Sequence, residues 1–454
     1  MIDLTTGNES RQIFRFAMPM LLGNVFQQLY NIVDSIIVGN YIGKEALGAV
    51  GASFPVVFVL ISFIVGLAMG STVIISQYFG AKQYQNIQKS VDTIMITLLV
   101  TSVLVTIIGL LLSSFIFEML KLPEEIIPQA KIFFQVYMGG IIVFFGYNGV
   151  AAILRGLGDS KTPLIFLIIS TIVNIVLVIV FVIYFKWGVA GAAVATIIAQ
   201  GGAFITSVIY LNRTHDIIQI RLFRLTFDKE IFRKSVQIGL PSGLQHTFVA
   251  LGMMALFRIV NEFGTDTVAA YSVAGRIDSF AMLPAMNFSA ALSTFVGQNM
   301  GALKPERVKR GFESTLLMTS IVSVTVTISV IFFSRQFMGF FTDDVNVIEI
   351  GAKYLIIVSS FYILFTTMFI CAGVMRGAGD TLIPMFVTLI ALWLIRIPVS
   401  WVLSRHFGVE GIWWGIPVAW AVGAIFSYLY YRSGRWKKKS IIKQKINNET
   451  EELS

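Results

Sequence analysis

The stretch Leu154-Arg155-Gly156-Leu157-Gly158-Asp159-Ser160, followed by Pro163, occurs twice in this chain. Its second copy is Met375-Arg376-Gly377-Ala378-Gly379-Asp380-Thr381, followed by Pro384. The two arginines are 221 positions apart, and the same shift relates Gln77, Gly80 and Ala81 to Gln298, Gly301 and Ala302. A constant shift over separate motifs indicates that the chain is a duplication of one structural unit.

Long apolar segments surround both copies of this motif. Of the 454 residues, 56% are hydrophobic and 13% are charged, whereas soluble domains carry about 25% charged residues. A helix needs about 20 mostly apolar residues to cross a bilayer. We expect twelve such spans, at 13–38, 48–77, 92–117, 132–154, 163–185, 189–211, 235–261, 268–297, 313–334, 350–374, 384–404 and 409–431. The composition excludes a soluble domain and predicts an all-α polytopic membrane protein.

The duplication also predicts the arrangement of the spans. Each half has six of them, so the second half begins on the same side of the membrane as the first, as in parallel repeats. We expect two pseudo-symmetric six-helix lobes that face each other across a central cavity. The predicted parts are an N-terminal lobe at 1–211, a cytoplasmic inter-lobe linker at 212–234, a C-terminal lobe at 235–432 and a cytoplasmic basic tail at 433–454.

The distribution of basic residues predicts the orientation. Loops on one side of the twelve spans, together with both ends of the chain, hold most of the 34 Lys and Arg residues, and cytoplasmic loops collect such residues. We therefore expect a multi-pass protein of the cell membrane with both termini in the cytoplasm. This bias and the basic tail account for the net charge of +9, so no nucleic-acid partner is needed.

Enzymatic and cofactor chemistry is not indicated. A single cysteine and three widely separated histidines offer no spacing typical of a metal site. The stretch that begins at Gly156 lacks the spacing of a nucleotide-binding loop, and its copy has Leu382 in place of Lys161. We interpret it as a tight cytoplasmic turn fixed by Arg155 and Asp159. Without a nucleotide site, any active transport must use an ion gradient.

The first span carries a polar face. Asn24, Gln27, Asn31 and Asp34 are spaced three, four and three residues apart, which places them on one side of a helix. A polar seam between helices would need amides but has no use for an acid, so Asp34 favours a titratable or cation-binding site. Further polar candidates in the first lobe, each of which could instead bond a neighbouring helix, are Tyr137, Asn148, Asn174 and Thr196.

The corresponding stretch of the second half retains no acid. Met253, Met282 and Met286 could form an adaptable apolar wall for varied ligands, or they could take part in ordinary helix packing. His246, Arg276 and Asp278 lie inside predicted spans and are further candidates for contact with substrate. Arg276 and Asp278 point apart on a helix, and structural ion pairing, for example between Asp278 and Arg396, is the alternative.

With these motifs the chain resembles multidrug and toxin extrusion (MATE) transporters of bacterial type over essentially its whole length. The resemblance rests on the paired turns at Arg155 and Arg376, the motifs that begin at Gln77 and Gln298, and the acid Asp34. It implies a two-lobe, twelve-helix antiporter that exchanges a cytoplasmic organic cation or other drug for inward-moving H⁺ or Na⁺. In that family the first-helix acid couples the ion, which carries over to Asp34. The surrounding polar positions correspond to Gln27, Tyr137, Asn148, Asn174 and Thr196.

The chain departs from many relatives in lacking further acids. The position one turn beyond Asn174 is Val178, and the interiors of spans 7 and 10 carry no acid. These differences favour H⁺ over Na⁺ as the coupling ion, with no other cofactor. The main rival function is a flippase for a lipid-linked precursor or polysaccharide, which would be expected to place several cationic residues in its cavity. We expect a monomer in the lipid bilayer that binds small-molecule drugs.

Overall fold

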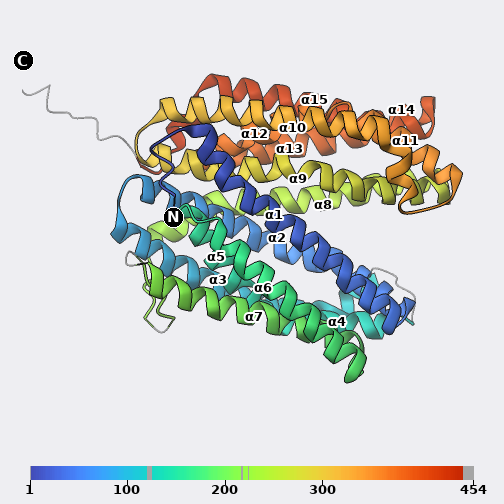
Figure 1. Cartoon of the computed structure of the whole chain (residues 1–454), viewed down its shortest axis with the longest axis horizontal. Helices are drawn as coiled ribbons and strands as arrows, with labels where there is room; N and C mark the ends of the chain where they lie inside the picture. Colours follow the sequence, from blue (N-terminus) through green and yellow to red (C-terminus); the bar gives the residue numbers. More distant parts are fainter. Residues whose placement is uncertain (1, 120–124, 216–217, 223, 443–454) are drawn as a thin grey trace, which may run out of the picture.

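The computed structural model describes residues 2–119, 125–215, 218–222 and 224–442, and these residues are almost entirely helical (Figure 1). The first half consists of α1 (Glu9–Tyr41), α2 (Lys44–Gly80), α3 (Tyr84–Met119), α4 (Ile127–Gly139), α5 (Ile141–Gly156), α6 (Lys161–Val178), η1 (Ile179–Tyr184) and α7 (Gly188–Thr214). The second half consists of α8 (Lys229–Asn261), α9 (Thr265–Gly301), α10 (Pro305–Gly339), α11 (Val345–Ser359), α12 (Tyr362–Ala378), α13 (Leu382–Leu389), η2 (Ile390–Arg396), α14 (Ile397–Phe407), α15 (Val409–Ser433) and η3 (Arg435–Lys439).

The predicted fold class, an all-helical polytopic membrane protein, is confirmed. Within the described residues, nine helices are long and apolar enough to cross a membrane, and up to eleven spans result if each of two bent pairs is one span. The bent pairs are α4 with α5, at 51°, and α11 with α12, at 50°. The predicted span at 13–38 is α1, which falls outside this count because its polar face lowers its hydropathy.

The helices of the two halves form two groups. Figure 1 shows α9 to α15 grouped on one side and α2 to α7 on the other, with α1 running diagonally between the groups. Accordingly, α1 packs against α9 and α10 as well as against α6 of its own half. In the same way, α8 packs against α2 and α3 of the first half and against α13 of the second. The first helix of each repeat thus contacts both halves.

Glycines allow the halves to approach closely where α2 crosses α8. Gly66 and Gly70 of α2 face Gly239 and Gly243 of α8. A Cβ atom on Gly70 would lie 2.9 Å from the backbone nitrogen of Gly239, which is too close for two unbonded atoms. Pairs of small residues four positions apart are a common way for membrane helices to bring their backbones together. This crossing holds α2 of the first half against α8 of the second.

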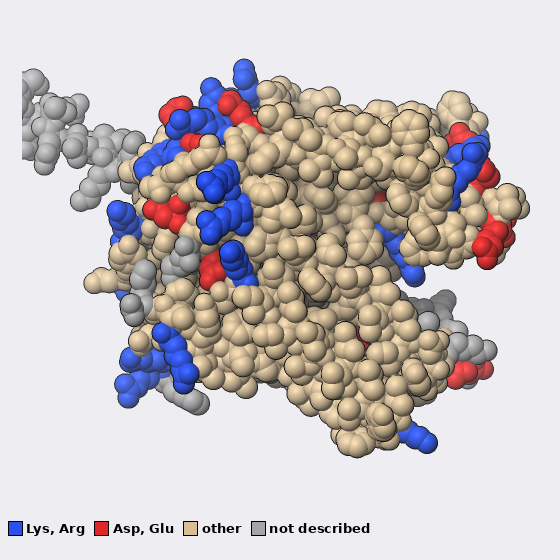
Figure 2. Space-filling view, in the orientation of Figure 1, with Lys and Arg blue, Asp and Glu red and all other residues tan. Residues whose placement is uncertain are grey.

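Basic side chains gather at one end of the molecule. In Figure 2, Lys and Arg cluster at the end where α1 begins and where the repeated turns lie, and the two groups of helices diverge toward the opposite end. We call the first of these the basic end. It contains the C-terminal ends of α2 and α9 and both described chain ends.

Candidate functional site

A cavity of about 580 Å³ lies between the two halves of the chain. Helices α1, α2, α5 and α6 of the first half line it, together with α8, α9, α11, α12, α13, η2 and α15 of the second. Most of its wall is apolar, with polar side chains at a few positions, as is typical of sites for small molecules. The expected central cavity is therefore present in the structure.

The structure brings several of the predicted residues into this cavity. The predicted residues in its lining are Gln27, Asn148, His246, Met253, Asp278, Met282 and Met286. Asn24, on the predicted polar face of α1, also lines the cavity and donates from Nδ2 to Oδ1 of Asn287, at 2.7 Å. Arg276 does not belong to the lining and is exposed on α9.

Asp34 lies in a separate polar cluster within the first half. Its members come from α1, α4, α6 and α7, and they are Tyr30, Asp34, Tyr137, Asn174 and Thr196. The Tyr30 hydroxyl lies 3.1 Å from Oγ1 of Thr196, and Asn174 donates to the same Oγ1 atom at 3.2 Å. Asp34 and Tyr137 are close enough to Tyr30 to act electrostatically on its hydroxyl. Four predicted residues from four different predicted spans therefore lie close together around Tyr30. They are Asp34, Tyr137, Asn174 and Thr196.

Two oxygen atoms in this cluster have no hydrogen-bond partner among the described residues. Oδ1 of Asp34 and Oδ1 of Asn174 are buried and accept no hydrogen bond from any described residue. Buried polar atoms in native proteins are usually satisfied, and both of these atoms are acceptors. The carboxylate of Asp34 could therefore take up a proton, and both oxygens could bind a small cation. Asn31, also predicted for this site, is exposed on α1.

The sequence analysis missed Tyr30. It precedes Asp34 by four residues, a spacing that places two side chains on the same side of a helix. This spacing is the feature of the sequence that points to Tyr30.

Asp278 has tyrosine partners. Its two carboxylate oxygens accept hydrogen bonds from the hydroxyls of Tyr354, at 3.1 Å, and Tyr362. Arg396 is near enough to act electrostatically on Asp278, but the ion pairs of the described residues do not include these two. Among the described residues, Asp278 is therefore held by hydrogen bonds from α11 and α12, and it forms no ion pair with Arg396.

The arginines of the repeated turns line the cavity, which the sequence analysis did not anticipate. Asp159 fixes its turn as expected, because Oδ1 accepts from the backbone nitrogens of Lys161 and Thr162, both at 3.1 Å. Arg155 does not share in this bonding and points to the cavity instead. In the second turn Asp380 accepts from the Tyr430 hydroxyl at 2.5 Å, and Arg376 again lines the cavity.

The two halves are bonded to each other at the basic end by a symmetric exchange. Gln77 donates from Nε2 to the Gly377 carbonyl at 2.9 Å, and Gln298 donates from Nε2 to the Gly156 carbonyl at 3.2 Å. Each glutamine of the repeated motif therefore bonds the repeated turn of the other half. The described chain ends add to this contact, because the backbone nitrogens of Leu4 and Ile441 donate to Gln298 and Gln77. These contacts close the cavity at the basic end.

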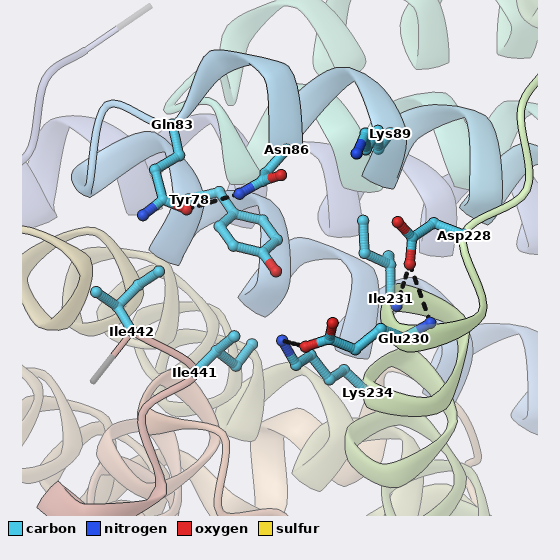
Figure 3. Close-up of a pocket in the computed structure, with 10 residues that line it drawn as sticks. All are labelled: Tyr78, Gln83, Asn86, Lys89, Asp228, Glu230, Ile231, Lys234, Ile441 and Ile442. Carbon is cyan, nitrogen blue, oxygen red and sulfur yellow. Dashed lines mark hydrogen bonds and ion pairs between the residues drawn. The ribbon is translucent and has the colours of Figure 1, made fainter.

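A second, smaller pocket lies at the basic end beside α2, α3 and α8 (Figure 3). Its charged groups are largely satisfied within the protein. Lys234 pairs with Glu230 at 2.6 Å, and Oδ1 of Asp228 accepts from the backbone nitrogens of Glu230 and Ile231. Ile441 forms part of the wall. We interpret this pocket as a by-product of the docking of the C-terminal segment.

The chain is similar to known transport proteins over nearly its full length. The family model described as MatE matches residues 19–180 and 241–402, one stretch in each half. The probable multidrug resistance protein YpnP of Bacillus subtilis is 33% identical over 443 residues, which cover 98% of this chain and 99% of that protein. The probable multidrug resistance protein NorM of Thermotoga maritima is 28% identical, over 95% of this chain and 94% of its own length.

Solved structures share the fold. An outward-facing multidrug resistance MATE family transporter of the MOP superfamily superposes with a TM-score of 0.89 at 24% identity, over 96% of this chain and 98% of that one. A MATE crystal structure in complex with MaD5 gives a TM-score of 0.89 at 25% identity, over 96% of this chain and 99% of the other.

Proposed function

This chain belongs to the MatE family of multidrug efflux membrane transporters, which are not enzymes, and from that premise we propose that it is a secondary active antiporter. It exports amphiphilic drugs, organic cations among them, in exchange for inward-moving ions by alternating access. Two features together support the proposal: a cavity between the two halves of the chain, and, in a separate cluster of the first half, the acid Asp34, whose buried Oδ1 has no partner among the described residues.

The cluster around Tyr30 is the proposed coupling site. A coupling group must change its charge or its ligands between two states so that ion and drug bias the same equilibrium. Asp34 can do this by taking up a proton, which removes the negative charge of the carboxylate and converts one acceptor oxygen into an O–H donor. The position one turn beyond Asn174 is the fully buried Val178, which offers no second carboxylate. This single-acid site supports H⁺ in preference to Na⁺.

The basic end is the proposed cytoplasmic side. Basic residues favour the cytoplasmic face of a membrane, and both described chain ends lie at this end of the molecule. With this orientation the structure is closed toward the cytoplasm. Drug would enter the cavity after the contacts of Gln77 and Gln298 separate.

Dye transport in everted membrane vesicles tests the proposal. Vesicles that contain the full chain are given an imposed pH gradient or an imposed Na⁺ gradient, and uptake of the dye is recorded. We expect the pH gradient to drive uptake and dye addition to release protons. Dye movement that follows only its own concentration gradient would contradict antiport.

The methionines of the cavity predict selectivity. Met253 and Met286 both line the cavity, and their flexible thioethers can adapt to ligands of different shape. We expect the double variant Met253→Ala/Met286→Ala to change the rank order of exported dyes while expression stays normal. Met254→Ala is the matched control, because Met254 is its exposed neighbour on α8 and does not line the cavity. An unchanged rank order of the dyes would mean that these methionines contribute to helix packing and do not select the ligand.

A further inference from the structure

The charge of the central cavity does not match a purely cationic ligand. Among the described residues, three arginines line it, Arg155, Arg376 and Arg396, whereas Asp278 is its one carboxylate. Asp278 and Arg396 act on each other electrostatically. Arg155 and Arg376 are left as an uncompensated positive charge. An organic cation would be repelled at this part of the cavity.

Neither of these two arginines has an acidic partner in the described part of the chain. The ion pairs present there involve other residues. Arg376 is 8% exposed, its Nε atom has no hydrogen-bond partner among the described residues, and Nη2 lies at the long distance of 3.4 Å from Oε1 of Gln245. The aspartates of the same turns bond elsewhere. Burial of an unpaired charge is costly in free energy, so a counter-ion would be stabilising here.

The two arginines approach the closed end of the cavity from opposite lobes. Arg155 precedes Gly156, whose carbonyl is bonded by Gln298, and Arg376 precedes Gly377, whose carbonyl is bonded by Gln77. Each arginine therefore lies one residue before a backbone contact that joins the two halves, and its side chain lines the cavity. Ser160 adds a buried hydroxyl oxygen that lines the cavity and has no partner among the described residues. The closed end of the cavity, which we call the cavity floor, thus presents donors from both halves and, among the residues that the structure describes, no carboxylate.

We infer that the floor of this cavity binds the anionic head group of an amphiphile, with Arg155 and Arg376 on its two sides. A guanidinium presents parallel N–H groups that match a carboxylate, phosphate or sulfonate. The apolar wall above, which includes Met282 and Trp420, accommodates the rest of the molecule. The inference names a substrate class for the proposed transport site and so rests on that function. A zwitterionic drug could place its anionic group at the floor and its cation beside Asp278.

A matched pair of dyes tests this site. Rhodamine B carries a free carboxylate, and its ethyl ester has the same ring system without that negative charge. We expect the full-length protein in detergent to bind the carboxylate dye more tightly than the ester, measured by fluorescence anisotropy. Arg155→Gln and Arg376→Gln should each weaken binding of the carboxylate dye about tenfold to hundredfold, the usual range for a hydrogen bond to a charged group. Binding of the ester should change little.

Two controls separate charge from folding. Arg335→Gln removes an exposed arginine that pairs with Glu349 outside the cavity, and it should leave both affinities unchanged. Arg155→Lys keeps the positive charge and should retain part of the preference for the carboxylate dye. Thermal unfolding of each variant shows whether the chain is folded. Equal loss of both dyes in a folded variant would overturn the anion site.

A second experiment distinguishes a lipid head group from the anionic group of a drug as the ligand of this site. Nanodiscs with and without phosphatidylglycerol are compared, and native mass spectrometry counts the lipids that stay bound. Loss of phosphatidylglycerol in both arginine variants, without an effect on the dyes, assigns the site to a lipid head group. No effect on dye or lipid overturns the inference. Because the equilibrium measurements need no ion gradient, failure of gradient-driven transport counts against the proposed function and leaves this test intact.

Discussion

At the scale of the residue, Asp34 is the group on which the proposed ion coupling depends. An acid inside a membrane span is costly and is retained mainly where it serves a function. The side-chain amide of asparagine resembles the neutral form of the acid, but it cannot take up and release a proton. The variant Asp34→Asn should therefore fold normally and lose gradient-driven dye efflux. Vesicle transport together with a thermal unfolding curve measures both properties.

The second buried acid provides the comparison. Asp278 is held by the hydroxyls of Tyr354 and Tyr362 on neighbouring helices, and Asp278→Asn keeps an oxygen that can accept from one of them. We expect this variant to retain at least part of the efflux. If Asp34→Asn still pumps dye against a gradient and Asp278→Asn does not, the coupling site lies in the other lobe.

At the scale of the element, the crossing of α2 and α8 depends on glycine. A methyl group added at Gly70 would press against the backbone of α8, and overpacking of this kind costs about 1–3 kcal/mol. Gly70→Ala should therefore lower the thermal unfolding temperature and weaken transport, because the lobes can no longer meet at their normal distance. Thermal unfolding and dye efflux check this expectation.

A glycine in open space is the matched control. A Cβ atom on Gly202 of α7 would meet nothing within 4 Å, and alanine is a better helix former than glycine by about 1 kcal/mol. Gly202→Ala should leave stability unchanged or raise it. Equal behaviour of the two variants would show that the close crossing does not limit stability.

At the scale of the whole molecule, the proposed alternating access requires the basic end to open. Ser76 of α2 and Gly297 of α9 lie on opposite sides of the closed contact, and a Cβ atom on Gly297 would lie 3.0 Å from the Ser76 Cβ. This is slightly shorter than the span of about 3.5–4.5 Å in a disulfide, so a small shift permits the bond. In a Cys371→Ala background, Ser76→Cys with Gly297→Cys should lock this end when oxidised and stop efflux.

Reduction of that disulfide should restore transport, which also shows that the double variant folds. The two single-cysteine variants should be insensitive to oxidation. Full efflux by the oxidised, cross-linked protein would mean that drug does not pass through the basic end.

Much of the architecture could be predicted from the sequence because its signals are local. Apolar length identifies spans, and the 221-residue shift of the Arg155 turn identifies the duplication. The resemblance to a transporter family rested on the same motifs and is confirmed. Only part of the candidate coupling site could be predicted in this way. The spacing of polar residues on α1 places Gln27 and Asp34 on one face of the helix, but it does not show which residues of other helices lie beside them.

The apolar segments of the sequence are sufficient to predict the membrane helices, the repeated motifs predict the duplication, and the spacing of polar residues predicts which helices carry a polar face. Which polar side chains meet depends on how the helices pack: Asp34 lies in a cluster around Tyr30, whereas Gln27 lines the cavity and Asn31 is exposed. Helix packing also places the side chains of Arg155 and Arg376 at the cavity, where they take no part in the hydrogen bonds of their own turns. The reason is that helix formation depends on near neighbours in the chain, while the tilt and rotation of a membrane helix depend on packing against helices far away in sequence.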